Sequence, residues 1–328
     1  MSYCRSRLAE IDGVGFSSGA LNRLADGRAF PTRLAFDRSE FAQIAADTME
    51  HISISGVQEK LSMRLERGAL KPVEEGGQYI LKPIPGTTLP RHQRDVPANE
   101  HLTMQIAEQV YDLETAANAC IELADGEPAY VTRRFDRSPE GKRIAQEDFC
   151  QLMGRTKKTH GQQYKYSSSY ERLGEALKTY CPAYRVEAEK LFRQIVFNYA
   201  VGNGDAHLKN FSLKETEFGD YVLTPAYDLM CTKLHLPRET RFALDVFEEK
   251  IPASRKTHGF VTGADLIELA DRYGIQRQRA IKILDRFCED SDDVDRLIAR
   301  SFLSEEARED YRSIIEDRRR ALRIRSTE

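Results

Sequence analysis

The stretch from Asn203 to Asn210 reads Asn-Gly-Asp-Ala-His-Leu-Lys-Asn and holds residue types that phosphotransfer chemistry uses. Asp205 precedes Asn210 by five residues, which is the spacing of a phosphotransferase catalytic loop. In such a loop the aspartate accepts or orients the proton of the attacking hydroxyl, and the asparagine holds a Mg²⁺ ion that neutralises phosphate charge. The sequence therefore predicts Asp205 as the catalytic residue and Asn210 as a magnesium ligand.

A second magnesium ligand is predicted at Asp228. Residues 211–213 and 221–224 favour two short strands, with a turn over 217–220 between them. This hairpin would return Tyr227 and Asp228 to Asn210, and Mg²⁺ is usually held by one or two carboxylates plus phosphate oxygens. Each segment alone is more typical of an ordinary loop or a helix cap. Their order, with a hairpin between them, favours the catalytic interpretation.

A phosphotransferase also needs a loop over the phosphates and a lysine that contacts them. Residues 53–60 read Ser-Ile-Ser-Gly-Val-Gln-Glu-Lys and precede a predicted strand, although a single glycine is a weak signal for a phosphate loop. Lys82 ends the next predicted strand. Glu100 lies early in the helix that follows and could pair with Lys82, as a strand lysine and a helix glutamate do in kinases. It could equally be an acidic residue favoured by the helix dipole.

The surrounding pattern predicts the elements that position these residues. Leu61, Met63 and Leu65 alternate with polar residues, and residues 78–82, 130–135 and 143–149 also favour strands, the last of which could equally begin a helix. A helix is expected after Pro97. Residues 188–199 carry an apolar stripe at helical spacing that ends at Gly202, and residues 262–324 predict about three amphipathic helices.

These elements predict an α+β chain with two lobes, because strands dominate the front and helices the back. We expect a strand-rich N-lobe over 1–150 that carries the phosphate loop and the ATP lysine. An all-helical C-lobe over 151–328 would carry the catalytic loop and the metal-binding aspartate. A chain of 328 residues is long enough for two such lobes.

Composition excludes several classes of protein. Lys and Arg number 49 against 52 Asp and Glu, which gives a net charge of −3 and no reason to expect direct nucleic-acid binding. The basic tail from Arg312 to Arg325 is interpreted as a solvated helix face rather than a nucleic-acid patch. No apolar run approaches the length of a membrane helix, and the charged N-terminus is unlike a secretory signal, so a cytoplasmic protein is expected.

Cysteine and histidine give no sign of a metal centre. The six cysteines include no Cys-x-x-Cys pair, and we interpret them as free thiols. The seven histidines form no His-Glu-x-x-His motif.

Several motifs in order resemble those of the HipA-family serine/threonine kinases. They are Ser-Ile-Ser-Gly-Val-Gln-Glu-Lys (53–60), Tyr-Ile-Leu-Lys (79–82), Asn-Glu (99–100), Arg-Phe-Asp-Arg (134–137), Gln-Glu-Asp-Phe-Cys-Gln (146–151), residues 202–210 and Tyr-Asp (227–228). The resemblance runs from about residue 50 to 240. It implies a two-lobed kinase-like fold that uses ATP and Mg²⁺.

The resemblance also implies roles for individual residues. It makes Asp205 catalytic and Lys82 a contact of the ATP phosphates, with Glu100 as its partner. The further ATP-binding residues are Ser55, Gly56, Val57, Gln58, Arg133, Phe135, His207 and Lys209, and the Mg²⁺ ligands are Asn210 and Asp228. Members of the family usually carry glutamate where Arg133 stands, a change that a backbone contact to adenine tolerates. Ser53 and Ser55 would be autophosphorylation sites.

Two features point to a compact subgroup. The Ser-Ile-Ser loop and the opening Met-Ser-Tyr-Cys-Arg resemble HipT, the kinase toxin of HipBST toxin–antitoxin systems, which lacks the extra N-terminal subdomain of full-length HipA. That resemblance implies a HipS-like small antitoxin and a HipB-like DNA-binding protein as partners. It also implies an aminoacyl-tRNA synthetase as substrate, tryptophanyl in the HipT subgroup, whose phosphorylation blocks translation.

Two other functions remain open from the sequence. A spacing of five between Asp and Asn also occurs in small-molecule phosphotransferases such as aminoglycoside kinases. A non-catalytic HipA-like scaffold could regulate a DNA-binding antitoxin, although pseudokinases usually lose the catalytic aspartate, the metal ligands or the lysine.

Overall fold

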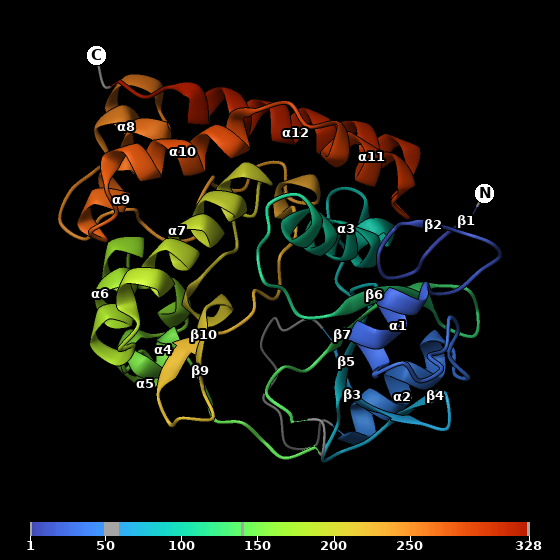
Figure 1. Cartoon of the computed structure of the whole chain (residues 1–328). Helices are drawn as coiled ribbons and strands as arrows, with labels where there is room; N and C mark the ends of the chain where they lie inside the picture. Colours follow the sequence, from blue (N-terminus) through green and yellow to red (C-terminus); the bar gives the residue numbers. More distant parts are fainter. Residues whose placement is uncertain (1, 49–58, 139–140, 327–328) are drawn as a thin grey trace. The chain divides into compact units, whose positions relative to one another are not determined.

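A computed structural model of the chain describes residues 2–48, 59–138 and 141–326 (Figure 1). The chain divides into two compact units. The N-terminal unit holds Met1–Val110, Thr115–Arg143 and Asp293–Arg308, and the C-terminal unit holds Tyr111–Glu114, Ile144–Asp292 and Glu309–Glu328. The main change of unit therefore falls at residues 143–144, and a segment near the end of the chain joins the N-terminal unit.

A five-stranded antiparallel sheet forms the centre of the N-terminal unit. Its strand order is β4-β3-β5-β7-β6. The alternation at Leu61, Met63 and Leu65 is confirmed, since these three side chains are buried in β3 and their neighbours are not. The strands are β3 (Leu61–Glu66), β4 (Ala69–Pro72), β5 (Tyr79–Pro83), β6 (Asn118–Glu122) and β7 (Pro128–Arg133).

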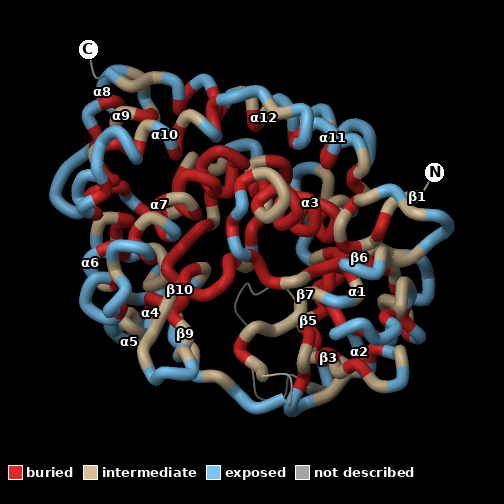
Figure 2. The backbone as a smooth tube through the Cα atoms, viewed as in Figure 1, coloured by how far each residue is buried: buried red, intermediate tan, exposed pale blue. Residues whose placement is uncertain are grey.

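Helix α3 (Val96–Gln109) contacts β6 and β7 and is buried along almost its whole length (Figure 2). The expected helix after Pro97 is thus confirmed, with Pro97 in its first turn. Ahead of the sheet the chain forms β1 (Ser2–Tyr3), β2 (Glu10–Ile11), α1 (Ser18–Ala25) and α2 (Arg38–Thr48), and η2 (Gln93–Asp95) leads into α3. Phe41 of α2 packs into the core beside the sheet.

The segment 293–308 is tied to the N-terminal unit by polar contacts. It contains nearly all of α11 (Asp292–Arg300) and the first residues of α12 (Glu305–Arg323). Ser304 donates its hydroxyl to Asp95 at 2.8 Å, and the guanidinium of Arg300 lies 2.5 Å from Glu10. No local pattern predicted that this segment belongs to the N-terminal unit.

The C-terminal unit is mainly helical and is built around α7 (Tyr184–Ala200), which packs against α6 and α10. The expected apolar stripe is buried, and Gly202 follows α7 at a φ of +74°, a conformation that favours glycine. The other helices are α4 (Phe149–Leu152), α5 (Lys157–His160), η3 (Tyr164–Tyr166), α6 (Tyr170–Tyr180), η4 (Leu208–Asn210), η5 (Thr232–Leu234), α8 (Ala253–His258), α9 (Gly263–Arg272) and α10 (Arg277–Cys288).

This unit also contains a three-stranded antiparallel sheet, so the expectation of an all-helical C-lobe needs correction. The sheet has the order β10-β9-β8 and consists of β8 (Gln146–Asp148), β9 (Ser212–Glu215) and β10 (Tyr221–Leu223). The hairpin expected after Asn210 is confirmed as β9 and β10. The ambiguous stretch near residue 146 supplies both a strand and the start of α4, which Asp148 caps.

The basic tail is not simply a solvated helix face. Arg318 and Arg319 of α12 are buried. Arg318 lies over the ring of Tyr199 at 5.5 Å, and Arg319 pairs with Asp290 at 3.3 Å. The interpretation failed because a guanidinium can be buried when its long stem packs and its head finds partners.

All six cysteines are free, as expected, and all six are buried. Within the part of the chain that the structure describes, no helix is both long and apolar enough to span a membrane.

The close packing at Gly174 yields a stability prediction. A Cβ on Gly174 of α6 would lie 2.2 Å from Cε1 of Tyr273, and Tyr273 is held because its hydroxyl donates to the carbonyl of Tyr170. Gly174→Ala is expected to lower the free energy of unfolding by about 1–3 kcal/mol through overpacking. Urea unfolding measures this, with Gly19→Ala as control. The Cβ of that variant meets open space in α1, so it should be neutral or stabilising. An unchanged midpoint for Gly174→Ala would contradict the packing.

Candidate active site

The loop from Asn203 to Asn210 is fixed by hydrogen bonds with buried side chains. Asn203 donates its side-chain amide to Oδ1 of Asn198 at 2.7 Å, and Oδ1 of Asn203 accepts from the amide of Asp205 at 3.2 Å. The amide of Gly204 donates to the hydroxyl of Thr232 at 2.8 Å. Buried polar groups need such partners, so these contacts fix the path of the backbone at Asp205.

Asp205 accepts a hydrogen bond from the phenol of Tyr166, with 2.5 Å between the two oxygens. Burial raises the pKa of Tyr166, and the Asp205 charge raises it further, so the phenol stays protonated and acts as a donor. The carboxylate of Asp205 is about half exposed. Asp205 therefore already accepts one hydroxyl and remains reachable from solvent.

His207 lies beside Asp205 and is neutral at physiological pH. Burial lowers the pKa of its imidazole to about 4, although the charge of Asp205 opposes the shift. Nε2 lies 4.0 Å from the Asp205 carboxylate, and this contact is consequently not an ion pair. The ring stands edge-on to Tyr166, with 5.2 Å between ring centroids. His207 thus has a packing role in the loop between Asp205 and Asn210.

Asn210 and Asp228 lie next to each other, as expected from the predicted hairpin. The side-chain amide of Asn210 lies 3.4 Å from Oδ2 of Asp228. Tyr227 secures this contact because its hydroxyl donates to the carbonyl of Lys209 at 2.8 Å. Oδ1 of Asn210 accepts from the amide of His207 at 3.1 Å, and a carbonyl oxygen keeps a second lone pair. Two adjacent oxygen donors, one of them a carboxylate, fit the preferences of Mg²⁺.

Lys209 is directed to another partner in this structure. Its amine lies 3.4 Å from the carboxylate of Asp148, the residue that caps α4, and its side chain is about half exposed. The Asp148 charge raises the pKa of Lys209 against the opposing effect of burial. Any contact of Lys209 with a phosphate would have to compete with this ion pair.

The lysine half of the predicted site lies in the N-terminal unit. Lys82 near the end of β5 places Nζ 2.7 Å from Oε1 of Glu100 in the first turns of α3. Both side chains are nearly excluded from solvent, at 10% and 3% exposure. The structure therefore brings together the two residues whose pairing the sequence suggested. The register of β5 and the start of α3 hold them there.

Arg133 is bound within the N-terminal unit. Its guanidinium makes two contacts of 2.8 Å with Asp26, and its backbone amide donates to the carbonyl of Ala117. Phe135 follows the end of β7 and is half-buried. The side chain and the amide of Arg133 are thus committed to structural partners.

Asp136 explains part of the Arg-Phe-Asp-Arg motif. It is buried and lies within 2.7 Å of both Arg134 and Arg137. Burial alone would raise the pKa of this carboxyl, but the hydrogen bond and charge of Arg134, with Arg137, hold the pKa below its usual range. The motif therefore fixes the chain after β7 through a buried ion cluster.

Five predicted residues lie outside the described part of the chain. They are Ser53, Ser55, Gly56, Val57 and Gln58.

The sequence did not indicate Tyr166, Thr232 or Glu239 as parts of the site. Thr232 accepts from Gly204 and donates to the carboxylate of Glu239. Burial raises the pKa of Glu239 to about 7, and the nearby charge of Asp205 adds to the shift. Tyr166 lies 39 residues before Asp205, and no local pattern marks the contact. The other site residues could be predicted from their spacing and from their positions at strand ends. Tyr166, Thr232 and Glu239 have no such pattern around them.

Comparison with known proteins identifies relatives along most of the chain. A family model described as the HipA-like C-terminal domain matches residues 52–294. A Haemophilus influenzae protein named "Putative kinase" is 26% identical over 322 residues, which cover 92% of each chain. Y4dM of Sinorhizobium fredii, named in the same way, is 30% identical and covers 84% of this chain and 70% of its own.

Two solved structures share the fold. HipA of Shewanella oneidensis, solved with HipB and operator DNA, superposes with a TM-score of 0.60 at 23% identity, covering 83% of this chain and 65% of that one. The proinflammatory kinase CtkA of Helicobacter pylori superposes with a TM-score of 0.54 at 14% identity, covering 83% and 92%. The chain therefore has a two-lobed, kinase-like fold, and it spans about two thirds of the HipA chain.

The buried pair of Lys82 and Glu100 is expected to be strongly coupled. Lys82→Met leaves a buried carboxylate without its ion-pair partner and should lower the free energy of unfolding by about 3–5 kcal/mol. The double variant Lys82→Met with Glu100→Leu should lose much less free energy of unfolding than the sum of the two single variants, because no charge is then left buried. Urea unfolding of the wild type, the two single variants and the double variant measures this coupling. If the losses in the free energy of unfolding are additive, the coupling is contradicted. Lys71→Met, at an exposed pair, is the control and should cost about 1 kcal/mol or less.

Glu239 is expected to make stability depend on pH. Its folded pKa of about 7 lies above its usual value of 4.5, so the folded protein retains a proton that the unfolded chain releases. The free energy of unfolding should therefore fall as pH rises between these two values. Glu239→Gln should remove this component of the slope, while the exposed control Glu217→Gln should keep it. Urea unfolding from about pH 4 to about pH 8 tests this. Equal slopes in the wild type and Glu239→Gln would contradict it.

Proposed function

The chain belongs to the HipA family, and from this premise we propose that it is an ATP-dependent serine/threonine protein kinase and the toxin of a toxin–antitoxin system. The observation that carries the proposal is the cluster of Asp205, Asn210 and Asp228 in one loop region of the C-terminal unit. His207 lies close enough to both aspartates for their charges to act on its imidazole. A base for the hydroxyl proton and two oxygen ligands for a metal are what phosphoryl transfer needs.

In this proposal Asp205 positions the attacking hydroxyl of a serine or threonine and accepts its proton. The hydrogen bond from Tyr166 supports the role, since it places a hydroxyl on the same carboxylate. Tyr166 occupies one oxygen of Asp205, so a substrate hydroxyl would take the other oxygen or replace the phenol. The proton would reach Asp205 directly, because neutral His207 lies 4.0 Å away.

The remaining residues would bind nucleotide and metal. Asn210 and Asp228 would hold Mg²⁺, which neutralises charge on the ATP phosphates when bound. Lys82 would contact the phosphates, with Glu100 fixing the direction of its amine. Residues 55–58 would cover the phosphates, and the chain near Arg133 and Phe135 would hold adenine through backbone groups. The amide of Arg133 is already bonded, so Phe135 is the better candidate for that contact.

We further propose an aminoacyl-tRNA synthetase as the substrate, tryptophanyl by resemblance to the compact HipT kinases. Autophosphorylation would fall on Ser53 or Ser55, where a phosphate adds a charge of about −2 to the loop that covers ATP. Incubating the chain and labelled ATP with purified synthetases tests the substrate. Label on a different synthetase, or on none, would overturn this part of the proposal without affecting the kinase activity itself.

The proposed partners are a HipB-like DNA-binding protein and a HipS-like small antitoxin. Support for the first comes from Shewanella HipA, which was solved with HipB and operator DNA. The second rests on resemblance to the HipT subgroup alone. Co-purification with each protein would test the two partners separately.

The competing functions receive less support. An aminoglycoside kinase needs an acidic surface for its cationic substrate, whereas the side chains of Tyr166 and His207 beside Asp205 are uncharged. A non-catalytic scaffold would not need the aspartate, both metal ligands and the paired lysine together.

Replacing the catalytic carboxylate tests the activity. Asp205→Gln is expected to lower autophosphorylation by about 10²–10⁴-fold, the usual contribution of a general base. The measurement is the intact mass of each protein after incubation with Mg·ATP, followed by mapping of the added phosphate. Asp271→Asn, which removes an exposed charge on α9, is the control and should behave as wild type. Equal phosphate incorporation in Asp205→Gln and the wild type would refute the assignment.

A further inference from the structure

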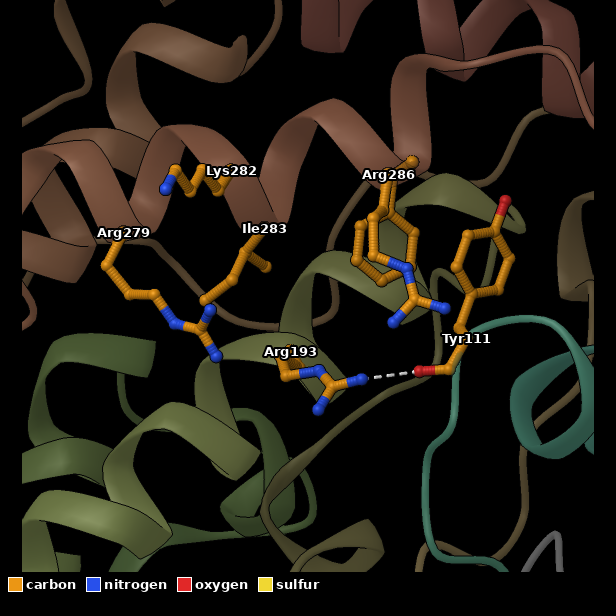
Figure 3. A pocket seen from close by; sticks show the side chains of 7 residues that line it. Tyr111, Arg193, Arg279, Lys282, Ile283 and Arg286 are labelled. Atoms are coloured by element: carbon orange, nitrogen blue, oxygen red, sulfur yellow. Dashed lines mark hydrogen bonds between the residues drawn. The ribbon is translucent and has the colours of Figure 1, made fainter.

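A cavity of about 90 Å³ opens in the C-terminal unit among α7, α10 and the chain at Tyr111 (Figure 3). Arg193 lies on α7, whereas Arg279, Lys282 and Arg286 lie on α10. The guanidinium groups of Arg193, Arg279 and Arg286 converge on the space, and Lys282 stands at its edge. None of these residues belongs to the proposed kinase site.

Positive charge exceeds negative charge around this cavity. Arg279 pairs with Glu189, and Arg286 lies 2.9 Å from Asp112. Within the part of the chain that the structure describes, Arg193 and Lys282 form no ion pair with a carboxylate, which gives the cavity an excess of two positive charges beyond these pairs. The pKa of Arg193 is lowered by burial and by repulsion from Arg286. An anion placed here would relieve that repulsion.

The guanidinium groups are held in position by their existing contacts. Arg193 donates to the carbonyl of Tyr111 at 2.6 Å. Arg279 binds Glu189 through Nε and one terminal nitrogen, which leaves its other terminal nitrogen for a ligand. Little side-chain entropy is therefore lost on binding. Arginine also presents its donors in a planar fork that suits phosphate oxygens.

One wall of the cavity is apolar and rigid. Tyr111 and Phe287 stack with 4.3 Å between centroids and an interplanar angle of 15°. Ile283 lies beside them and is buried. Apolar walls lower the local dielectric and strengthen the attraction between an anion and the arginines.

The size and charge of the cavity select the ligand. Pockets for whole small molecules usually measure about 300–1,000 Å³, so a nucleotide does not fit in 90 Å³. A single phosphoryl group does fit, with the rest of its carrier outside. Its charge of about −1.5 to −2 matches the excess of two positive charges, whereas a carboxylate offers only one negative charge.

We propose that this cavity binds a phosphoryl dianion, either free phosphate or the phosphate of a phosphorylated side chain. The arginine pair Arg279 and Arg286 would grip it from α10, and Arg193 would contact it from α7. The site is independent of the proposed transfer of phosphate at Asp205.

Calorimetric titration of the full chain with inorganic phosphate, with a phosphoserine peptide and with the same peptide unphosphorylated tests the proposal. The test variant is Arg279→Met with Arg286→Met. The control is Arg277→Met with Arg185→Met, which removes two exposed arginines from the same helices away from the cavity. Phosphate, the phosphopeptide or both should bind the wild type and the control equally, and the test variant at least tenfold more weakly.

The pattern of binding distinguishes the two sources. Binding of phosphate alone supports free phosphate as ligand, and binding that requires the phosphopeptide supports a phosphorylated protein segment. Lys282→Met provides a milder second variant in case the double variant does not fold, and it should weaken binding by a smaller factor. Absence of binding to the wild type, or binding that is undiminished in the cavity variants, overturns the proposal.

Discussion

The loop that carries Asp205 depends on a close approach of two backbones at Gly204. A Cβ at this position would lie 2.4 Å from the carbonyl oxygen of Thr240, so only glycine fits. The approach lets the amide of Gly204 donate to Thr232, whose hydroxyl donates in turn to Glu239. Since buried polar groups must be hydrogen-bonded, the chain can pack here in only one register. That register places Asp205 at the next position, where its carboxylate accepts the hydrogen bond from Tyr166.

Burial leaves neutral groups beside the carboxylate of Asp205. The phenol of Tyr166 stays protonated and the imidazole of His207 stays uncharged, because burial opposes the ionised form of each. A charged donor would hold Asp205 more tightly than a phenol does. A hydroxyl of Tyr166 can exchange with a substrate hydroxyl of the same chemistry, whereas an ion pair would have to be broken. The environment of Asp205 thus fits a residue that must release one hydroxyl and accept another.

Local pattern predicted the elements whose residues face a core at regular spacing. The alternation in β3, the apolar stripe of α7 and the hairpin after Asn210 all have such spacing, and the structure contains each of them. Helix α2 was missed because its buried contacts rest on few residues, chiefly Phe41 and Ala45. Tyr166 was missed for another reason: its role arises from a contact 39 residues away, and spacing along the chain does not encode such contacts. Asp205, Asn210 and Asp228 could be predicted together because phosphotransfer restricts both their type and their order.

The arginines show most clearly that the amino-acid composition of a segment does not determine which of its side chains are buried. Arg318 and Arg319 were expected in solvent, yet both are buried, the first against Tyr199 and the second beside Asp290. Each has structural partners that account for its position, so neither requires a ligand. The arginines around the cavity differ, because Arg193 forms no ion pair among the described residues and the guanidinium groups converge on an open space. Like charges that are held close together repel one another, and a bound anion would relieve that repulsion. Whether an arginine has structural partners, rather than how many arginines a helix carries, distinguishes an arginine that only packs from one that is available to a ligand.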